Sequence, residues 1–195
     1  MTQGVLVLVG GLSASGKSTL AKRISETMQV PLISRDEIKE GLFDKMGTGD
    51  RDWSKKVGAA SYLMVYTVIE VLMKSGAWII VESNFDPSVD SEKVQEIMVN
   101  TGCRVLQIVC WAEKRILMKR FQSRVSEGQR HPGHRDELAE DEIFARFEIN
   151  KAPVLEVEGE VLQVDTTFPE NIDYASVIHK IHKTLAGQGD VSRGT

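Results

Sequence analysis

The sequence contains few cysteines, prolines and aromatic residues, and it has no long apolar run. Its two cysteines, Cys103 and Cys110, fit buried free thiols in a reducing compartment, because a disulfide framework would need more of them. No apolar run approaches the roughly 18 residues of a membrane-spanning helix, so no membrane partner is expected. Residues 5–9 are apolar but lack the basic flank and cleavage site of a signal peptide. These absences predict a cytoplasmic protein.

The chain also lacks an excess of positive charge. It has 28 acidic and 24 basic residues, for a net charge of −4, so a long nucleic acid is a less expected partner than a small molecule. The remaining composition, 42% hydrophobic and 27% charged, is typical of a globular protein of one compact domain. We expect residues 1–186 to form this domain as a monomer or homodimer, and residues 187–195 to form a flexible tail.

Short apolar runs alternate with longer helical patterns along the chain. Strands are expected at residues 5–9, 30–34, 77–81, 104–110 and 160–164, and their Val, Ile and Leu content indicates burial on both faces. Helices are expected after residue 19, over 36–45, over a mostly buried 53–74, from Asp90, over 112–127 and 136–150, and around Ile178, Ile181 and Leu185. The pattern predicts an α/β fold with three α/β/α layers, a five-stranded parallel sheet and a helical lid over about residues 115–136.

The clearest motif follows the first expected strand. Residues 11–18 match G-x-x-x-x-G-K-[ST] without a mismatch, between an apolar strand and an amphipathic helix. In such a P-loop, backbone N–H groups surround anionic oxygens, Lys17 reaches the outer phosphates and Ser18 offers a hydroxyl to Mg²⁺. The predicted nucleotide contacts are Gly11, Ser13, Ala14, Ser15, Gly16, Lys17, Ser18 and Thr19.

A P-loop identifies a phosphate donor but leaves several reactions open. A GTPase should carry Asn-Lys-x-Asp for guanine, and here Asn150-Lys151 is followed by Ala-Pro. Residues 126–130 superficially resemble the signature loop of a transporter-type ATPase, but no apolar strand ending in Asp-Glu follows them. A kinase that acts on a separate acceptor is the interpretation that remains.

Ligands of an open parallel sheet bind beyond the carboxyl ends of its strands, and polar residues gather there in this chain. Asp36, just after the second strand, can accept the proton of an attacking hydroxyl and align it for in-line transfer. It could also simply be an N-cap or first-turn acid of the next helix. Arg35 beside it can bind an acceptor anion, or it can be a solvated surface residue.

Glu82 ends the third expected strand, and Ser83 and Asn84 follow it. An acid at this place commonly holds the metal through water or orients the reaction. Structural hydrogen bonds to Lys17 or Ser18 are the alternative for Glu82, and shaping of the turn is the alternative for Ser83 and Asn84. At the last strand end, Thr166 lies where adenine often rests, or it is a plain turn residue.

The segment after the fourth strand is basic. Its charged residues are Lys114, Arg115, Lys119, Arg120, Arg124, Arg130 and Arg135. Arg120 and Arg124 share one helix face, and residues 126–135 contain two glycines, a proline and two histidines, which favours a mobile lid that closes arginines over the transferring phosphoryl group. A solvated helix is the alternative. His131 and His134 have no clear ligand geometry and are expected to contact the lid or the acceptor.

With these motifs in place, the chain resembles ATP-dependent kinases that include the polynucleotide 5′-kinase domain, and more loosely the gluconate and zeta-toxin-like kinases. The resemblance rests on the P-loop and on residues 35–39, 80–84 and 119–124. It implies that Asp36 is the general base and that Arg124 contacts the reacting phosphates. Lys39 stands where that family has an arginine near the acceptor phosphate, and Glu82-Ser83-Asn84 stands where it has Asp-Thr-Asn.

The sequence therefore predicts an ATP-dependent kinase that transfers the γ-phosphate to a hydroxyl of a small acceptor, with ATP and Mg²⁺ bound. A polynucleotide 5′-hydroxyl kinase and a nucleotide-binding switch with slow hydrolysis are the alternatives. Lys17, Asp36, Arg120 and Arg124 are the predicted catalytic residues, and Arg120 and Thr166 add to the nucleotide contacts. Ser18 and Glu82 are the predicted metal contacts, and the predicted acceptor contacts are Arg35, Asp36, Lys39, Glu82, Asn84 and Arg130.

Overall fold

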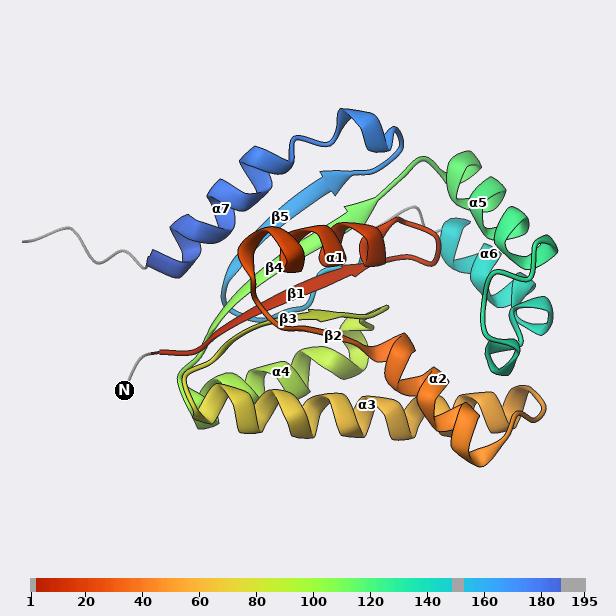
Figure 1. The fold of residues 1–195 in the computed structure, drawn as a ribbon, viewed down its shortest axis with the longest axis horizontal. Coiled ribbons are helices and arrows are strands. Elements are labelled where there is room, and N and C mark those ends of the chain that lie inside the picture. Colours follow the sequence, from red (N-terminus) through yellow and green to blue (C-terminus); the bar gives the residue numbers. More distant parts are fainter. Residues whose placement is uncertain (1–2, 149–152, 187–195) are drawn as a thin grey trace, which may run out of the picture.

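A five-stranded parallel sheet lies at the centre of the protein, with helices on both faces (Figure 1). The computed structural model describes residues 3–148 and 153–186. The strands run in the order β2-β3-β1-β4-β5, and every pairing is parallel. Their bounds are Val5–Gly11 for β1, Leu32–Ser34 for β2, Trp78–Glu82 for β3, Arg104–Trp111 for β4 and Glu160–Asp165 for β5. The expected parallel α/β sheet is confirmed, with strand ends shifted by one or two residues.

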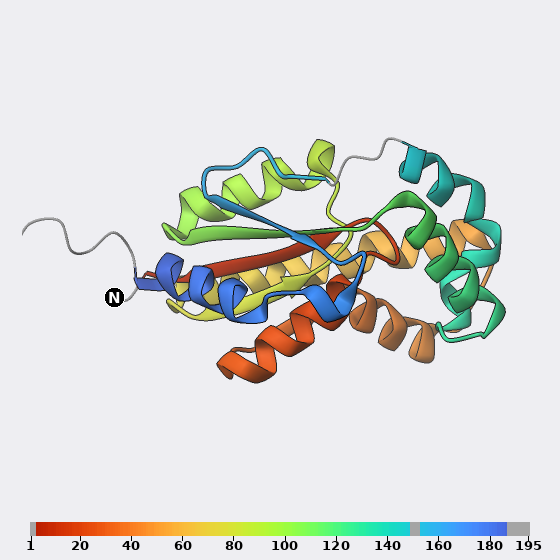
Figure 2. The same ribbon diagram turned by 90° about the horizontal axis from the view of Figure 1, so that it is seen from above.

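Successive side chains of β1 point alternately into two hydrophobic cores, one on each face of the sheet. Val5, Val7 and Val9 pack with α1 (Lys17–Met28) and α7 (Tyr174–Ala186). Leu6 and Leu8 pack on the opposite face with α3 (Arg51–Lys74) and α4 (Pro87–Thr101), and Figure 2 shows α4 and α7 on opposite sides of the sheet. Successive side chains of a strand point to opposite faces, so a continuously apolar strand such as β1 must be covered on both.

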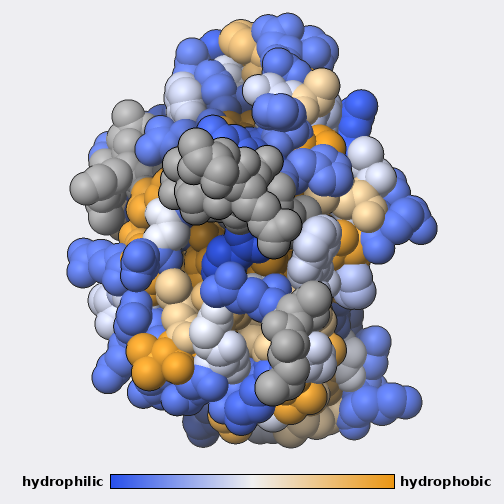
Figure 3. All heavy atoms as spheres, turned by 90° about the vertical axis from the view of Figure 1, so that its left-hand side faces the viewer, coloured by the Kyte–Doolittle hydropathy of each residue, from blue (hydrophilic) through white to orange (hydrophobic). Residues whose placement is uncertain are grey.

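The outer strand β5 differs from this pattern. Its residues alternate between exposed and partly buried positions until Val164, whereas all seven residues of β1 are buried. The expectation that all strands are buried on both faces is therefore wrong for this edge strand, which has a neighbour on one side only. The surface at the amino ends of the strands, which Figure 3 shows, is largely hydrophilic with small hydrophobic groups.

Side-chain caps set the beginnings of three helices. Ser34 accepts a hydrogen bond from the backbone of Glu37 at the start of α2 (Arg35–Met46), and Asp50 caps α3 in the same way. Asp86 caps α4, which begins at Pro87, so the expected start at Asp90 is wrong by one turn. Proline is favoured at the first position of a helix because it has no N–H to leave unpaired.

Helix α3 is less buried than its sequence predicts. One stripe of it faces the sheet, while Leu63 and Val71 are 71% and 63% exposed. Among the described helices it is the one whose length and apolar composition would permit a membrane crossing, with a mean hydropathy of 1.4 over 18 residues. The expectation that this helix is mostly buried is therefore wrong, since one stripe of it packs in the core and the rest is exposed. A helix that packs on a core in this way meets the same length and composition test as a membrane-spanning helix.

The lid follows β4 and stands at the carboxyl end of the sheet (Figures 1 and 2). It consists of α5 (Lys114–Ser126), two single-turn segments (Pro132–His134 and Asp136–Leu138) and α6 (Glu140–Glu148). A cluster around Phe121 and Phe147 joins α5 to α6 and reaches Leu12 and Ala14 of the P-loop. The helix expected over residues 136–150 is divided into the single turn Asp136–Leu138 and α6. Residues 149–150 of that helix and residues 187–195 of the expected tail lie outside the described part.

Candidate active site

The P-loop lies between β1 and α1 in a conformation that admits no side chain at its first glycine. Gly11 has a φ of +143°, and a Cβ atom there would lie 2.4 Å from the Cys110 carbonyl oxygen. Gly16, with a φ of +80°, precedes α1, whose first turn receives no side-chain cap. The open N–H groups of such a helix start, with its positive dipole end, favour bound anions.

Glu82 connects the P-loop with the start of α2. It is 2% exposed. Its Oε1 accepts a hydrogen bond from Ser18 Oγ at 3.0 Å and lies 3.7 Å from Lys17 Nζ. Its Oε2 accepts from Ser34 Oγ at 2.9 Å. The predicted metal contacts Ser18 and Glu82 are thus neighbours, and Ser34, missed as a site residue, joins the donor side to the predicted acceptor side.

Two further predicted nucleotide contacts have different settings. Thr19 is exposed on the first turn of α1. Thr166 is 2% exposed, and its hydroxyl donates to the backbone carbonyls of Ser15 at 2.6 Å and Trp111 at 3.0 Å. Thr166 therefore links the P-loop backbone at Ser15 to the end of β4 at Trp111.

Asp36 lies in the first turn of α2, where Ser34 rather than Asp36 is the cap. Its Oδ1 accepts from Arg35 Nη1 at 3.0 Å, and its Oδ2 pairs with Arg130 of the lid. Burial alone would raise the pKa of Asp36. The positive charges of Arg130, Lys17, His134 and Arg35 outweigh burial and hold the pKa well below its usual range. Asp36 is therefore ionised at neutral pH.

A second basic group lies on the α3 side of Asp36. The Arg35 guanidinium carbon lies 4.5 Å from the ring centre of Tyr62, and Lys39, 5% exposed, donates to Ser54 Oγ at 3.0 Å. Burial and the nearby Arg35 charge lower the pKa of Lys39 to about 8. A Cβ atom at Gly58 would lie 2.9 Å from Arg35 Nη2 and 3.6 Å from Lys39 Nζ, so this glycine makes room for both cations. Sequence reasoning missed Gly58 and Ser54, because their spacing carries no catalytic signal.

Asn84 follows β3 at the same end of the sheet. Its backbone carbonyl accepts from Tyr62 Oη at 2.9 Å, and that phenol accepts from Ser83 Oγ at 3.1 Å. Several buried polar atoms in this region have no hydrogen-bond partner, namely Ser15 Oγ, Arg35 Nε, Asn84 Oδ1 and Arg124 Nε. Buried polar atoms are normally paired, so their concentration here indicates a place for polar ligands.

The lid arginines divide between two settings. Arg124 Nη2 donates to Ser13 Oγ of the P-loop at 2.9 Å and lies 3.4 Å from Asp136 Oδ2. Arg130 Nη1 contacts both Asp136 oxygens at 3.0 and 3.1 Å. Arg120 instead donates to the carbonyls of Thr166 at 2.7 Å and Thr167 at 3.2 Å, so a contact between Arg120 and phosphates requires those bonds to change. Asp136, which carried no signal beyond a helix start, joins Arg124 to Arg130.

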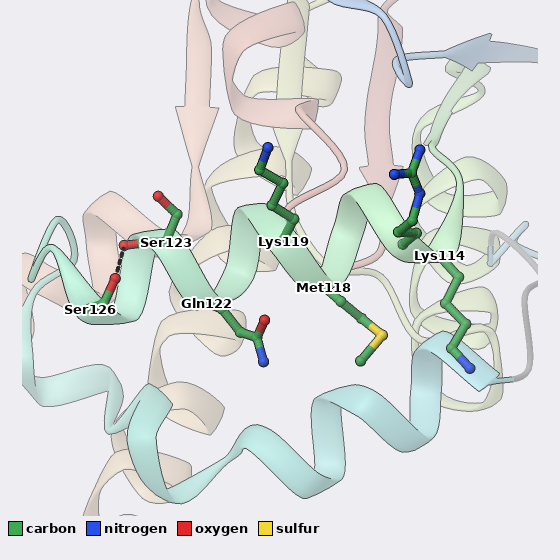
Figure 4. Close-up of a pocket in the computed structure, with 7 residues that line it drawn as sticks. Lys114, Met118, Lys119, Gln122, Ser123 and Ser126 are labelled. Carbon is green, nitrogen blue, oxygen red and sulfur yellow. Dashed lines mark hydrogen bonds between the residues drawn. The ribbon is translucent and has the colours of Figure 1, made fainter.

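Three other basic residues of the lid, Lys114, Arg115 and Lys119, line a groove on the outer face of α5. This groove, of about 670 Å³, is lined by Lys114, Arg115, Met118, Lys119, Gln122, Ser123 and Ser126. In Figure 4, Met118 and Gln122 extend to one side of α5 and Lys119 to the other. The groove includes neither Arg120 nor Arg124. The unpaired polar atoms and the charge network lie instead around Asp36 and the P-loop, which makes that region the candidate site.

A P-loop beside a buried carboxylate, beneath a lid that carries arginines, defines the class of P-loop kinase-like proteins. The profile of a family described as an AAA domain matches residues 6–149. The chain belongs to this family of P-loop kinase-like domains.

Solved structures agree with this assignment. A protein of Chloroflexus aurantiacus described as a candidate kinase is 35% identical, with a TM-score of 0.87, over 93% of this chain and 98% of that chain. The APS kinase of Mycobacterium tuberculosis, solved with AMPPNP and APS, is 14% identical, with a TM-score of 0.59, over 95% and 99% of the two chains. A sugar kinase of Janibacter is 14% identical, with a TM-score of 0.57, over 95% of each chain. The last two show a shared fold alone. No functionally curated protein matches the chain.

Proposed function

We propose that this protein is an ATP-dependent kinase that transfers the γ-phosphoryl group to a hydroxyl of a small acceptor aligned by Asp36. The observation that carries the proposal is the setting of Asp36. Its carboxylate is ionised, lies near enough to Lys17 for that charge to lower its pKa, and is reached by Arg130 of the lid. In P-loop kinases catalysis is mostly positioning and charge stabilisation, and this arrangement supplies both.

On the donor side, the N–H groups at the start of α1 bind phosphate oxygens and Lys17 reaches the outer phosphates. Ser18 and Glu82 present hydroxyl and carboxylate oxygens 3.0 Å apart, the hard donors that Mg²⁺ prefers, directly or through water. Mg²⁺ bound there would neutralise charge on the β- and γ-phosphates. Arg124, held at Ser13, stabilises the negative charge of the transferring group.

On the acceptor side, Asp36 aligns the hydroxyl more than it activates it. A carboxylate whose pKa is held below its usual range is a weak base. The acceptor oxygen forms its bond to the γ-phosphorus as the bond to the ADP oxygen breaks, and the hydroxyl proton passes to Asp36 and then to solvent. This order suits a loose transition state, in which the proton leaves late.

The acceptor carries an anionic group beside its hydroxyl. Arg35 and Lys39 place two positive charges around Gly58, and Lys39 has a hydroxyl, from Ser54, as its hydrogen-bond partner. Asp36 offsets burial and the Arg35 charge only in part, since the pKa of Lys39 remains lowered, and a bound carboxylate, phosphate or sulfate would relieve the remaining cost of a buried ammonium.

Acceptor screening with the Asp36→Asn variant tests the proposal. Labelled ATP and Mg²⁺ are incubated with anionic and neutral sugars, nucleosides, aminoglycosides and 5′-hydroxyl oligonucleotides. We expect transfer to a small anionic acceptor, a loss of about 10²-fold or more in Asp36→Asn, and ATP affinity within about twofold. Glu37→Gln, an exposed neighbour in the same helical turn, is the control and should retain full activity.

The outcomes separate the alternatives. Phosphorylation of oligonucleotides alone would identify a polynucleotide 5′-hydroxyl kinase. Hydrolysis with no acceptor product would identify a slow nucleotide hydrolase. Transfer that Asp36→Asn leaves unchanged would overturn the role of Asp36.

A further inference from the structure

The lid contains a short segment, His131-Pro132-Gly133-His134, that packs tightly against α2. Gly133 is buried, and a Cβ atom there would lie 2.3 Å from Phe43 Cδ2. The His131 ring stacks on Phe43, with centroids 5.5 Å apart and planes at 8°, and His134 meets the same ring edge-on at 6.0 Å. Phe43 is 2% exposed. Space for a side chain at Gly133 is therefore absent, and we call residues 131–134 the latch.

Polar contacts fasten the latch to both acceptor-side helices. His134 is 4% exposed, and its Nε2 lies 2.8 Å from Glu40 Oε1 of α2. Ser54 Oγ of α3 lies 3.3 Å from the His134 carbonyl, to which it donates. His131 Nε2 lies 3.2 Å from Asp44 Oδ1. The latch is thus bonded to α2, which carries Asp36 and Lys39, and to α3, which carries Ser54 and Gly58.

The residue directly before the latch is Arg130, which pairs with Asp36 and Asp136. Neighbouring Cα atoms are about 3.8 Å apart, so the docked latch restricts where the Arg130 side chain can reach. Its side chain is 16% exposed and that of Asp36 is 27% exposed. With the latch docked, Arg130 pairs with Asp36 Oδ2, so the Asp36 carboxylate is only partly exposed to water and one of its oxygens is held by a lid cation.

We propose that the latch is a positioning device for the proposed transfer reaction: it holds Arg130 at the Asp36 carboxylate until an acceptor hydroxyl replaces Arg130 there. While Arg130 stays in place, Asp36 does not align water for attack on ATP. This role rests on the proposed function. Gly133, His134 and Glu40 are positioning residues, since they act through Arg130. Arg124 shares Asp136 with Arg130, but it also donates to Ser13 Oγ of the P-loop, and its helix α5 is packed by Phe121 and Phe147. Release of the latch therefore exposes Asp36 while Arg124 stays at the P-loop.

The test uses Gly133→Ala, a change that adds one methyl group. The φ of Gly133 is not in the left-handed region, so crowding at Phe43 is the effect of the substitution. We expect trypsin to cleave after Arg130 about tenfold faster than in wild type, because the local opening free energy falls. We also expect acceptor-free ATP hydrolysis to rise about fivefold, with ATP affinity within about twofold, because water reaches Asp36.

Matched variants separate crowding from general damage. Gly41→Ala lies on α2 with no atom within 4 Å of the added Cβ, and it should behave as wild type. Phe43→Leu combined with Gly133→Ala restores space and should return proteolysis and hydrolysis to within about twofold of wild type. If Gly133→Ala fails to fold, Glu40→Gln, which weakens the His134 contact, takes its place with smaller changes in the same direction.

Two results would overturn the inference. Unchanged proteolysis in both Gly133→Ala and Glu40→Gln would show that the segment does not hold the lid. Faster proteolysis with unchanged or lower acceptor-free hydrolysis would show a purely structural contact. Neither readout needs an identified acceptor, so a failure of the proposed kinase activity, seen as no transfer in wild type, remains distinguishable.

Discussion

The donor and acceptor halves of the site are built in different ways. Residues 11–19 form the phosphate cradle as one continuous segment between β1 and α1. The acceptor half joins α2, α3 and the lid, and its central ion pair links Asp36 to Arg130, 94 residues further along the chain. A contiguous cradle depends on local backbone conformation, whereas the acceptor half depends on how separate elements pack.

Under the proposed function, the two halves have different tasks. The donor half rests on buried strands and on Glu82, which Lys17, Ser18 and Ser34 surround. The acceptor half contains an unpaired amide oxygen at Asn84 and a lysine of lowered pKa. We expect changes to the donor half to abolish activity with every acceptor, and changes to the acceptor half to alter which acceptor is used.

Removal of Lys17 should have the largest effect, because it disables the donor half. In Lys17→Met we expect the kcat/KM for transfer to fall about 10³-fold, since a buried positive charge at the phosphates is lost. Acceptor binding should change little. Steady-state kinetics with Lys22→Met, an exposed lysine on the same helix, provides the control. A similar loss in both variants would contradict a specific role for Lys17.

Removal of Arg124 tests the place where lid and P-loop meet. Arg124→Met should lower kcat about 10²-fold, because a preorganised cation at the transferring group is lost. The KM for ATP should rise less than kcat falls. The matched change Arg115→Met, in the outer groove of α5, should leave kcat within about twofold. A large loss in Arg115→Met would place the chemistry in that groove.

Gly58→Ala tests the acceptor half alone. Its Cβ atom would lie 2.9 Å from Arg35 Nη2, so the guanidinium must move away from its place over Tyr62. We expect the acceptor KM to rise about tenfold, with the ATP KM unchanged in the same assay. Exposed Ala60 of the same helix, as Ala60→Ser, is the control. Equal changes in both KM values would show that the two halves are not separate.

The smallest effect concerns the pH dependence of acceptor binding. Burial and Arg35 lower the pKa of Lys39 to about 8. Lys39 is mostly protonated at pH 7 and loses its charge as the pH rises through that value, so it binds an anion less well above pH 8. We expect the acceptor KM to rise about fourfold between pH 7 and pH 8.5, and Lys39→Met to abolish this rise. A flat profile in wild type would remove Lys39 from the anion site.

Much of the donor half could be predicted from the sequence. The glycines, Lys17 and Ser18 stand at fixed spacing, and the φ values of Gly11 and Gly16 explain why glycine is needed there. The strands were also predictable because buried parallel strands need continuous apolar runs. Which face of α3 is buried was not predictable, since composition alone cannot show which apolar residues of an apolar helix pack against a neighbour.

The acceptor half was predicted in part. Asp36 and Arg35 were predicted from their places after the second strand, and Arg130 was predicted from its place in the lid. Asp136 and Gly58 carry no local signal. The histidines, proline and glycine of the latch indicated a lid but not its docking on Phe43, because these contacts depend on α2, α3 and the lid meeting in space. Arg120 shows the same limit: its spacing pairs it with Arg124, yet its guanidinium lies at the carbonyls of Thr166 and Thr167.

By itself, the sequence determined the sheet, the P-loop and the membership of a kinase-like class, because each depends on residues that are neighbours along the chain. The tertiary structure alone decided that Arg130 covers Asp36, that Gly58 admits two cations and that the latch docks on Phe43. The physical reason is that local backbone conformation and strand burial are encoded over short spans. An ion pair or a steric contact between residues about 20 to 90 positions apart exists only once packing has placed them together.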